Sequence, residues 1–231
     1  MDAEPPTTSK GTPTRAIPRW LQSPWTWVAG FIILAAAAAG AGIWVHTQSP
    51  ALQGAVVTPP APTYDFRLRD QHDQEIRLSG LRGKAVALTF LYANCPDVCP
   101  LIANTMHEAY QQLGAAAPRV ALLAVSVDPN GDTPQAVQRF LAAHRVEGEL
   151  HYLTGSFADL RPIWGHYYIG SDAKEVNPQA ASASAAPPGP VGHTAIIYVL
   201  DPGGNLRVFL PGNFDPKDLA TDLKILAAEA R

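Results

Sequence analysis

The sequence predicts an α/β domain of about 170 residues that follows an apolar N-terminal segment. The chain of 231 residues is 47% hydrophobic and only 16% charged, so it can bury a substantial core. Stretches typical of strands and of helices alternate from about residue 63 onward. An uncharged run of 21 residues, Trp25–Val45, stands apart near the N-terminus.

The N-terminal quarter of the chain is typical of a membrane anchor. Residues 1–24 are polar and rich in proline, which predicts a disordered tail. As a helix, residues 25–45 would be roughly 30 Å long, the thickness of a bilayer's hydrocarbon core. Basic residues precede this run, and the positive-inside bias then predicts a cytoplasmic tail. A cleavable signal peptide is the alternative, but its apolar core is usually shorter.

This anchor predicts where the rest of the chain lies. We expect a single-pass protein of the inner (plasma) membrane whose C-terminal domain is on the extracytoplasmic, periplasmic side. Residues 46–62 contain four prolines among small residues, which predicts a stiff tether. Residues 63–231 then form one domain by size.

The first half of the domain predicts a hairpin and two buried strands with a helix between them. Residues 66–68 and 76–78 flank a polar turn, as in a short hairpin. The continuous apolar runs 85–92 and 120–127 are typical of strands that are buried on both faces. Residues 96–113 show helical spacing, with a proline in the first turn and a glycine after the end.

The second half predicts three helices and three strands. In order these are helix 133–145, strand 151–153, helix 157–167, strands 194–200 and 206–210, and helix 216–230. Asp132 or Thr133 caps the first of these helices, and Ser156 caps the second. The whole order predicts two central parallel strands and a terminal antiparallel hairpin, which is the thioredoxin-like arrangement.

The composition narrows the possible functions. Cys95 and Cys99 are the only cysteines, too few for a four-cysteine zinc site, an iron–sulfur cluster or a multi-disulfide scaffold. The net charge is −3, and no basic excess favours a nucleic-acid partner. The cysteine pair is therefore where chemistry is expected.

The position of the pair favours reactive thiols. A buried strand is expected to end at Tyr92 and a helix to begin at about Pro96, so that Cys95 lies beside the N-cap and Cys99 one turn later. A helix N-terminus favours thiolates, so we expect lowered pKa values for both. Three residues separate the cysteines, whereas thioredoxin-like redox pairs usually have two. The spacing favours a metal site, and two soft thiolates favour Cu(I). A structural disulfide is the alternative, although so short a loop gives little stabilisation.

An imidazole would complete such a site, and His193 is the best placed of the seven histidines. It precedes an apolar strand and follows a loop rich in alanine and proline. Position alone leaves open whether His193 is a ligand or has a structural role.

Three segments of the chain match a known pattern: TFLYANCPDVCP at 89–100, SVDPNGDTP at 126–134 and HTAIIYVLDPGG at 193–204. In these segments the chain resembles the SCO/SenC copper-binding proteins, which assist assembly of the copper centre of cytochrome c oxidase. The resemblance implies copper ligation by Cys95, Cys99 and His193. The family commonly has an aspartate before the histidine, where this chain has Gly192.

The resemblance implies a membrane-anchored chaperone that delivers copper, as Cu(I) or Cu(II), to the copper-bearing subunit of cytochrome c oxidase or to another cuproprotein. The alternative is a thiol–disulfide reductase in which Cys95 and Cys99 are a redox-active pair that keeps target cysteines reduced or signals redox state. Of these two functions, only thiol–disulfide reduction would make the protein an enzyme. A peroxidase of the peroxiredoxin type is less consistent, because no arginine neighbours Cys95. A non-enzymatic interaction module with a structural disulfide is the remaining alternative.

Overall fold

The computed structural model describes residues 24–47, 51–170 and 195–230. The chain divides into two units, residues 1–49 and 50–231. In the first unit the described part is helix α1, Pro24–Thr47. Within the described residues, no helix meets the length and hydropathy needed to cross a membrane.

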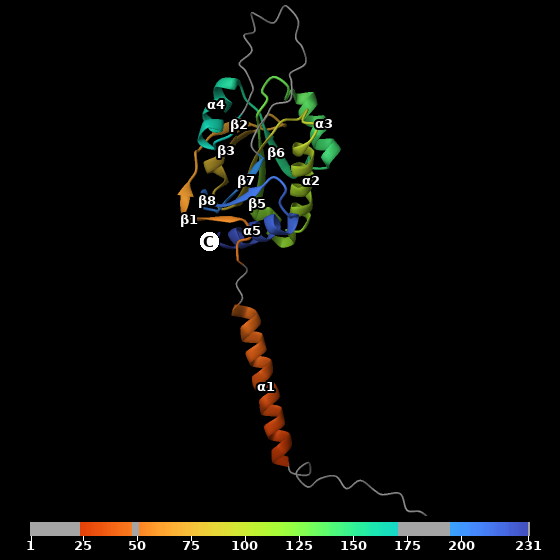
Figure 1. Ribbon diagram of the computed structural model, residues 1–231, viewed down its shortest axis with the longest axis vertical. Helices are drawn as coiled ribbons and strands as arrows, with labels where there is room; N and C mark the ends of the chain where they lie inside the picture. Colours follow the sequence, from red (N-terminus) through yellow and green to blue (C-terminus); the bar gives the residue numbers. More distant parts are fainter. Residues whose placement is uncertain (1–23, 48–50, 171–194, 231) are drawn as a thin grey trace, which may run out of the picture. The chain divides into compact units, whose positions relative to one another are not determined.

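The second unit is built on a six-stranded mixed sheet (Figure 1). Its strands, in sheet order, are β1 (Ala55–Pro62), β8 (Asn205–Pro211), β7 (Ile196–Leu200), β4 (Ala85–Leu91), β5 (Val120–Ser126) and β6 (Leu150–Leu153). Strands β4, β5 and β6 run parallel, whereas β7, β8 and β1 pair antiparallel with their neighbours. The predicted parallel centre and terminal hairpin are both confirmed.

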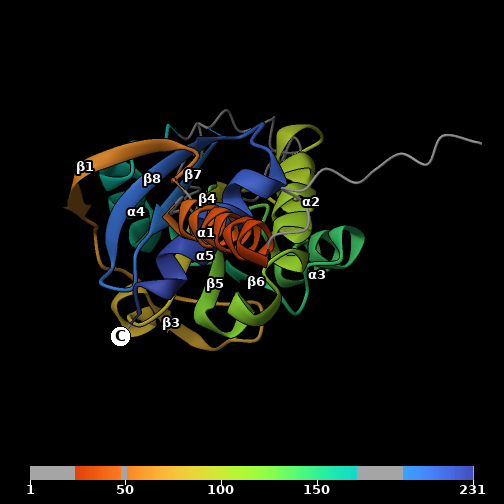
Figure 2. The ribbon, with the colours of Figure 1, turned by 90° about the horizontal axis from the view of Figure 1, so that it is seen from below.

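In the described part of the domain, four α-helices cover this sheet. They are α2 (Val98–Gln111), α3 (Pro134–His144), α4 (Phe157–His166) and α5 (Pro216–Ala228). Helices α2 and α3 lie on one side of the sheet, where α5 contacts α2, and α4 lies on the other side (Figures 1 and 2). Thr133 caps α3 by accepting a hydrogen bond from Ala136 N, and Ser156 caps α4 in a capping box with Asp159, as such side chains stabilise helix starts.

The core lies against the two central strands. Every residue of β4 and of β5 is buried, which explains why both strands are continuous apolar runs rather than alternating ones. Phe90, for example, is fully buried and contacts the rings of Tyr167 and Tyr198. The strands therefore hold their C-terminal ends, and the loops that follow them, in fixed positions.

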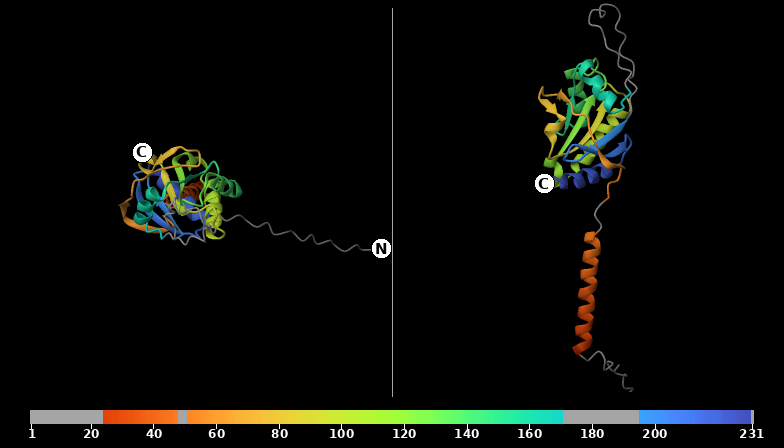
Figure 3. Two further views of the ribbon diagram at one scale, coloured as in Figure 1. Left: turned by 90° about the horizontal axis from the view of Figure 1, so that it is seen from above. Right: turned by 90° about the vertical axis from the view of Figure 1, so that its left-hand side faces the viewer.

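Residues 46–62 were expected to form a tether, but Ala55–Pro62 instead forms the edge strand β1, paired with β8. The segment before β1 is held by Asp222 of α5, whose carboxylate accepts hydrogen bonds from Gln53 N at 2.7 Å and Gly54 N at 3.3 Å. Figure 3 shows this strand at the edge of the sheet.

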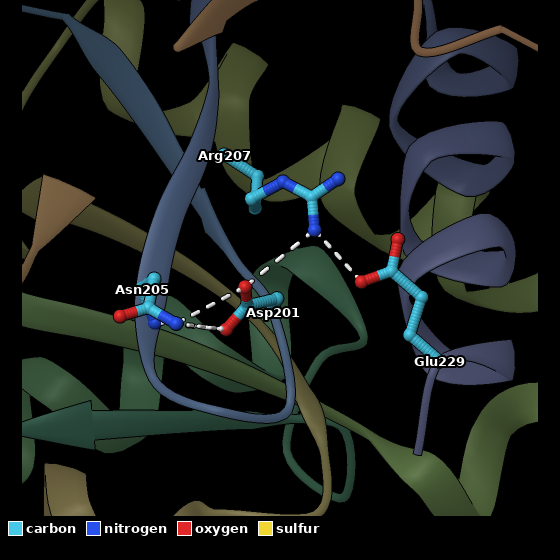
Figure 4. A network of polar contacts seen from close by, with 4 residues as sticks. All are labelled: Asp201, Asn205, Arg207 and Glu229. Atoms are coloured by element: carbon cyan, nitrogen blue, oxygen red, sulfur yellow. Dashed lines mark hydrogen bonds and ion pairs between the residues drawn. The ribbon is translucent and has the colours of Figure 1, made fainter. Parts of the chain in front are cut away.

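A polar network holds the β7–β8 hairpin to the last helix (Figure 4). In the turn, the Asp201 carboxylate accepts hydrogen bonds from Asn205 N at 2.9 Å and from the Asn205 side-chain amide. Arg207 of β8 then joins Asp201, at 3.5 Å, to Glu229 just after α5, at 2.7 Å. The hydrogen bond that Arg207 donates to Glu229 is the main reason why the pKa of Arg207 lies above its usual value.

The predicted small hairpin is also present, as β2 (Arg67–Arg69) paired with β3 (Glu75–Arg77). Its turn is organised by the buried Asp70, which accepts hydrogen bonds from His72 N and Gln74 N and contacts His151 Nδ1 at 3.1 Å. Burial raises the pKa of Asp70, but these partners outweigh it and leave the pKa lowered.

Candidate metal centre

The cysteines lie where β4 passes into α2. Residues 92–97, here called the cysteine loop, connect the end of β4 at Leu91 to the start of α2 at Val98. Cys95 therefore lies in the loop, outside the helix, and Cys99 lies in the first helical turn. Cys95 was expected beside the N-cap, but α2 begins two residues later than expected and its N-cap is Asp97.

Pro100 explains the later start. A proline has no N–H and its ring clashes with the carbonyl four residues earlier, so it is tolerated in the first turn and not beyond it. A helix that began at Pro96 would place Pro100 after the first turn, opposite the carbonyl of Pro96. With α2 beginning at Val98, Pro100 is the third residue of the helix, where its missing N–H has no cost.

The two cysteines are in direct contact. The backbone N–H of Cys99 donates to the sulfur of Cys95 at 3.4 Å. They are not joined in a disulfide. Cys95 is 8% exposed and Cys99 is fully buried. The two thiols thus lie together at the N-terminus of α2, with Cys95 in the loop and Cys99 in the first helical turn.

The two thiols differ in acidity. Burial raises the pKa of Cys95, but hydrogen bonds from the backbone of Asp97 and Cys99 outweigh it, so the pKa lies below the usual thiol value. Burial raises the pKa of Cys99 far above that value, and the neighbouring Cys95 sulfur raises it further. The expected lowering is confirmed for Cys95 and is wrong for Cys99, because the helix N-terminus does not compensate for complete burial.

A second loop, residues 127–133, supports the cysteine loop; we call it the supporting loop. Asp132 accepts a hydrogen bond from Ala93 N at 2.7 Å, and the Asn94 amide donates to Gly131 O at 3.0 Å. Asp128 organises the supporting loop itself by accepting from Gly131 N at 3.0 Å. A Cβ on Gly131 would lie 2.1 Å from the Asp128 carboxylate, so a larger residue at this position would displace that side chain.

Asp132 is the residue whose role sequence reasoning missed. It was a candidate cap for α3, but Thr133 caps that helix, and the Asp132 side chain points inward. Its carboxylate accepts from Ser126 Oγ at 2.5 Å and Tyr152 OH at 2.9 Å. Burial raises the pKa of Asp132 to about 6, although these hydrogen bonds oppose the shift. The sequence signal for Asp132 was its place in the SVDPNGDTP segment. A sequence segment does not show whether a side chain points into the domain or out of it.

The predicted third ligand, His193, lies outside the described residues. Within the described part of the chain, no three His, Cys, Asp or Glu side chains form a group that could hold a metal. A cavity of about 730 Å³ lies elsewhere, beside the β2–β3 turn and the starts of α3 and α4. Asp132 lines this cavity, but the cysteines do not.

Four described histidines have structural partners. His107 contacts Glu149 at 2.8 Å, His144 contacts Asn104 at 2.9 Å, His151 contacts Asp70, and His166 stacks on Tyr64. Each of these four side chains therefore contacts a partner other than the cysteines.

The two thiols suit a soft metal ion. Thiolates are soft ligands that favour Cu(I), and a sulfur at a helix N-terminus loses its proton readily. The pair is preassembled, since Cys99 N already contacts the Cys95 sulfur. Two thiolates at one place can hold a single Cu(I), or can form a disulfide by passing two electrons to an oxidant such as a target disulfide.

The chain is similar in sequence to several known proteins. A protein of Stutzerimonas stutzeri is 33% identical over 82 residues, 35% of this chain and 40% of that protein. Protein sco1 of Schizosaccharomyces pombe is 25% identical over 157 residues, 67% of this chain and 57% of that protein. The alignments thus span about half the length of these two relatives.

Solved structures share the fold. The structure of Bradyrhizobium japonicum ScoI with copper bound has a TM-score of 0.60 and 28% identity, covering 72% of this chain and 99% of that one. The solution structure of apo Sco1 from Thermus thermophilus has a TM-score of 0.58 and 29% identity, covering 77% and 95%. The thioredoxin-like fold of the described domain is therefore that of the copper-binding Sco proteins.

A family model described as SCO1/SenC matches residues 58–228, which is well over half of the chain and includes both cysteines and His193. The chain belongs to the SCO1/SenC family.

Proposed function

We propose that this protein is a copper metallochaperone. Cys95, Cys99 and His193 hold copper, which then passes by ligand exchange to the copper-bearing subunit of cytochrome c oxidase or to another cuproprotein. The observation that carries the proposal is the cysteine pair at the start of α2, where the backbone N–H of Cys99 donates to the Cys95 sulfur at 3.4 Å. It is supported by family relatives that have been solved with copper bound.

The unequal thiols suggest an order for copper loading. Cys95 has the lowered pKa and is partly exposed, so it binds the incoming ion first as a thiolate. Cys99 is a neutral thiol before binding, and a coordinating thiol loses its proton to the metal's charge. Loading of one Cu(I) on the pair releases the remaining thiol protons, so copper affinity rises with pH.

His193 is the proposed third ligand. A third donor from a separate segment makes ligand exchange stepwise, because one ligand can leave while the two thiolates still hold the ion. The glycine before His193 offers no carboxylate to orient the imidazole, so its ring is oriented by other groups or by the metal itself.

The second candidate function is thiol–disulfide reduction, and the contrast between the two thiols favours it. The Cys95 thiolate would attack a target disulfide and form a mixed disulfide, releasing one target thiolate. Cys99, deprotonated, would then attack the Cys95 sulfur and release the second target thiolate. The target gains two electrons, and the protein is left with a Cys95–Cys99 disulfide. His193 has no role in these steps.

We also propose that residues 25–45 anchor the protein in the inner membrane, with residues 1–24 in the cytoplasm and the domain in the periplasm. The proposal is supported by the uncharged run of the sequence and its preceding basic residues. The described apolar side chains of α1 are also exposed, among them Phe31 at 75% and Leu34 at 72%.

Titration of the full-length chain with Cu(I), in competition with a Cu(I) chelator, tests the chaperone proposal. The wild type should bind one Cu(I), and Cys95→Ser/Cys99→Ser should bind at least about 100-fold more weakly. Equal, weak binding by both proteins would refute the proposal. His193→Ala separates the two functions. If the variant still reduces a disulfide substrate but no longer supports formation of the recipient copper site, the chaperone is favoured. If it still supports formation of that site although it binds and transfers no copper, the reductase is favoured.

A further inference from the structure

The two proposed thiolate ligands are held in different ways. Cys99 belongs to α2, whose helical hydrogen bonds fix its position. Cys95 lies in the cysteine loop, where its own N–H bonds only within the loop, to Tyr92 O at 3.2 Å. Besides the contact of its sulfur with Cys99 N, the position of Cys95 relative to Cys99 therefore depends on what holds the cysteine loop against the rest of the domain.

Hydrogen bonds from two consecutive residues of the cysteine loop tie it to the supporting loop. Ala93 N donates to Asp132 Oδ1 at 2.7 Å, and the side chain of Asn94 donates to Gly131 O at 3.0 Å. Ala93 is two residues from Cys95, so a shift of its backbone moves the sulfur directly. The contact with Asp132 is the shorter of the two and is made by a carboxylate, which makes it the stronger tie.

Asp132 is itself firmly held. It is 6% exposed, and its Oδ2 atom accepts from Ser126 Oγ of β5 and from Tyr152 OH of β6. Burial keeps the pKa of Tyr152 well above its usual value, so its hydroxyl remains a donor. Two strands thus hold one oxygen of the carboxylate in place, and the other oxygen faces the backbone of the cysteine loop.

We propose that Asp132 is a positioning residue for the metal centre, because its hydrogen bond with Ala93 N presets the position of Cys95 relative to Cys99. The inference rests on the proposed copper function. Asp132 touches neither copper nor its recipient, but it reduces the rearrangement that the loop must undergo when copper binds.

The test compares Cu(I) affinities of full-length chains by chelator competition at pH 7. Asp132→Ala removes the acceptor and should weaken Cu(I) binding by about tenfold or more. Asp132→Asn keeps an acceptor oxygen of the same shape and should restore the affinity to within about threefold of the wild type.

Asp159→Ala is the matched control. Asp159 lines the same cavity and is also a carboxylate at the start of a helix, where it accepts from Ser156 Oγ at 2.6 Å. Its loss costs stability through the α4 cap but leaves the cysteine loop untouched, so Cu(I) affinity should stay at the wild-type value. A drop equal to that of Asp132→Ala would show a general effect of stability and overturn the inference.

Amide hydrogen exchange of the copper-free chains adds a readout that does not need copper. Ala93 N–H should exchange faster in Asp132→Ala and remain protected in Asp132→Asn and Asp159→Ala. If Asp132→Ala does not fold, Asn94→Ala replaces it in the test. This variant changes an exposed side chain and removes its hydrogen bond to Gly131 O, and it should weaken Cu(I) binding by about threefold.

Two results would overturn the inference: unchanged Cu(I) affinity when the tie is removed, or equal weakening by Asp132→Ala and Asp132→Asn, which would assign the effect to charge. A wild-type chain that binds no Cu(I) would instead refute the proposed function. In that case the hydrogen-exchange rate of the Ala93 N–H still decides whether Asp132 holds the cysteine loop.

Discussion

At the scale of single residues, Cys95 and Cys99 show how neighbouring thiols acquire different chemistry. The sequence places both at one helix N-terminus, from which lowered pKa values are expected for both. Burial decides otherwise for Cys99, which has no exposed surface, while Cys95 is 8% exposed and receives backbone hydrogen bonds. Depth below the surface depends on how α2 packs, and a local motif does not contain that information.

This difference predicts the order of alkylation. At pH 7 in the copper-free chain, Cys95 should react with iodoacetamide at least about tenfold faster than Cys99, because it is more exposed and has more thiolate. Rates are measured by mass spectrometry on Cys99→Ser and Cys95→Ser, each of which retains one thiol. Equal rates, or a faster Cys99, would contradict the assignment of the acidic thiol.

Asp132 predicts a pH dependence of stability. Its pKa is raised from 3.8 to about 6, so between these values the folded state holds a proton that the unfolded state has lost. Its contribution to stability is therefore complete below pH 3.8 and is lost as the pH rises through about 6. The loss amounts to about 3 kcal/mol.

Urea unfolding of the wild type and Asp132→Asn from pH 4 to pH 7 measures this contribution. The stability of the wild type relative to Asp132→Asn should fall across that range, since an amide does not titrate. The pKa values of Asp65 and Asp70 are lowered, so the titration of these residues changes stability only below about pH 4. Both residues are present in both proteins, so their effect cancels when the two stabilities are compared. A constant difference between the two proteins would show that Asp132 does not titrate in this window.

At the scale of elements, the sequence predicts those parts whose signals are local. The fully buried strands β4 and β5 are continuous apolar runs, and the starts of α3 and α4 carry capping residues. Strand β1 has no such signal, since its prolines and small residues show no alternation. It is fixed instead by β8 and Asp222, which are more than 140 residues away in the chain.

Asp222→Ala tests this distant support. The change leaves Gln53 N and Gly54 N without their acceptor and should lower the free energy of unfolding by about 1–3 kcal/mol. Faster hydrogen exchange should be confined to the segment before β1. Lys224→Ala, an exposed change on the same helix, is the control and should stay within about 0.5 kcal/mol. Equal effects of the two changes would mean that Asp222 does not hold this segment.

At the scale of the whole molecule, the sequence predicts the thioredoxin-like domain and places Cys95 and Cys99 at its strand-to-helix junction, where they are found. The later start of α2 could be inferred only by weighing Pro100 against Pro96 as the first-turn proline. The part played by Asp132 depends on which way one side chain points in the folded domain. His193 stays a prediction from position and family resemblance.

The ligand set of the copper-loaded protein tests the central claim most directly. X-ray absorption at the copper edge, recorded on full-length wild type and His193→Ala loaded with one copper, distinguishes sulfur from nitrogen ligands. We predict two sulfur ligands and one imidazole in the wild type, with the imidazole signal lost in His193→Ala and both sulfurs kept. Identical spectra for the two proteins, or a wild-type spectrum without sulfur ligands, would contradict a copper centre formed by Cys95, Cys99 and His193.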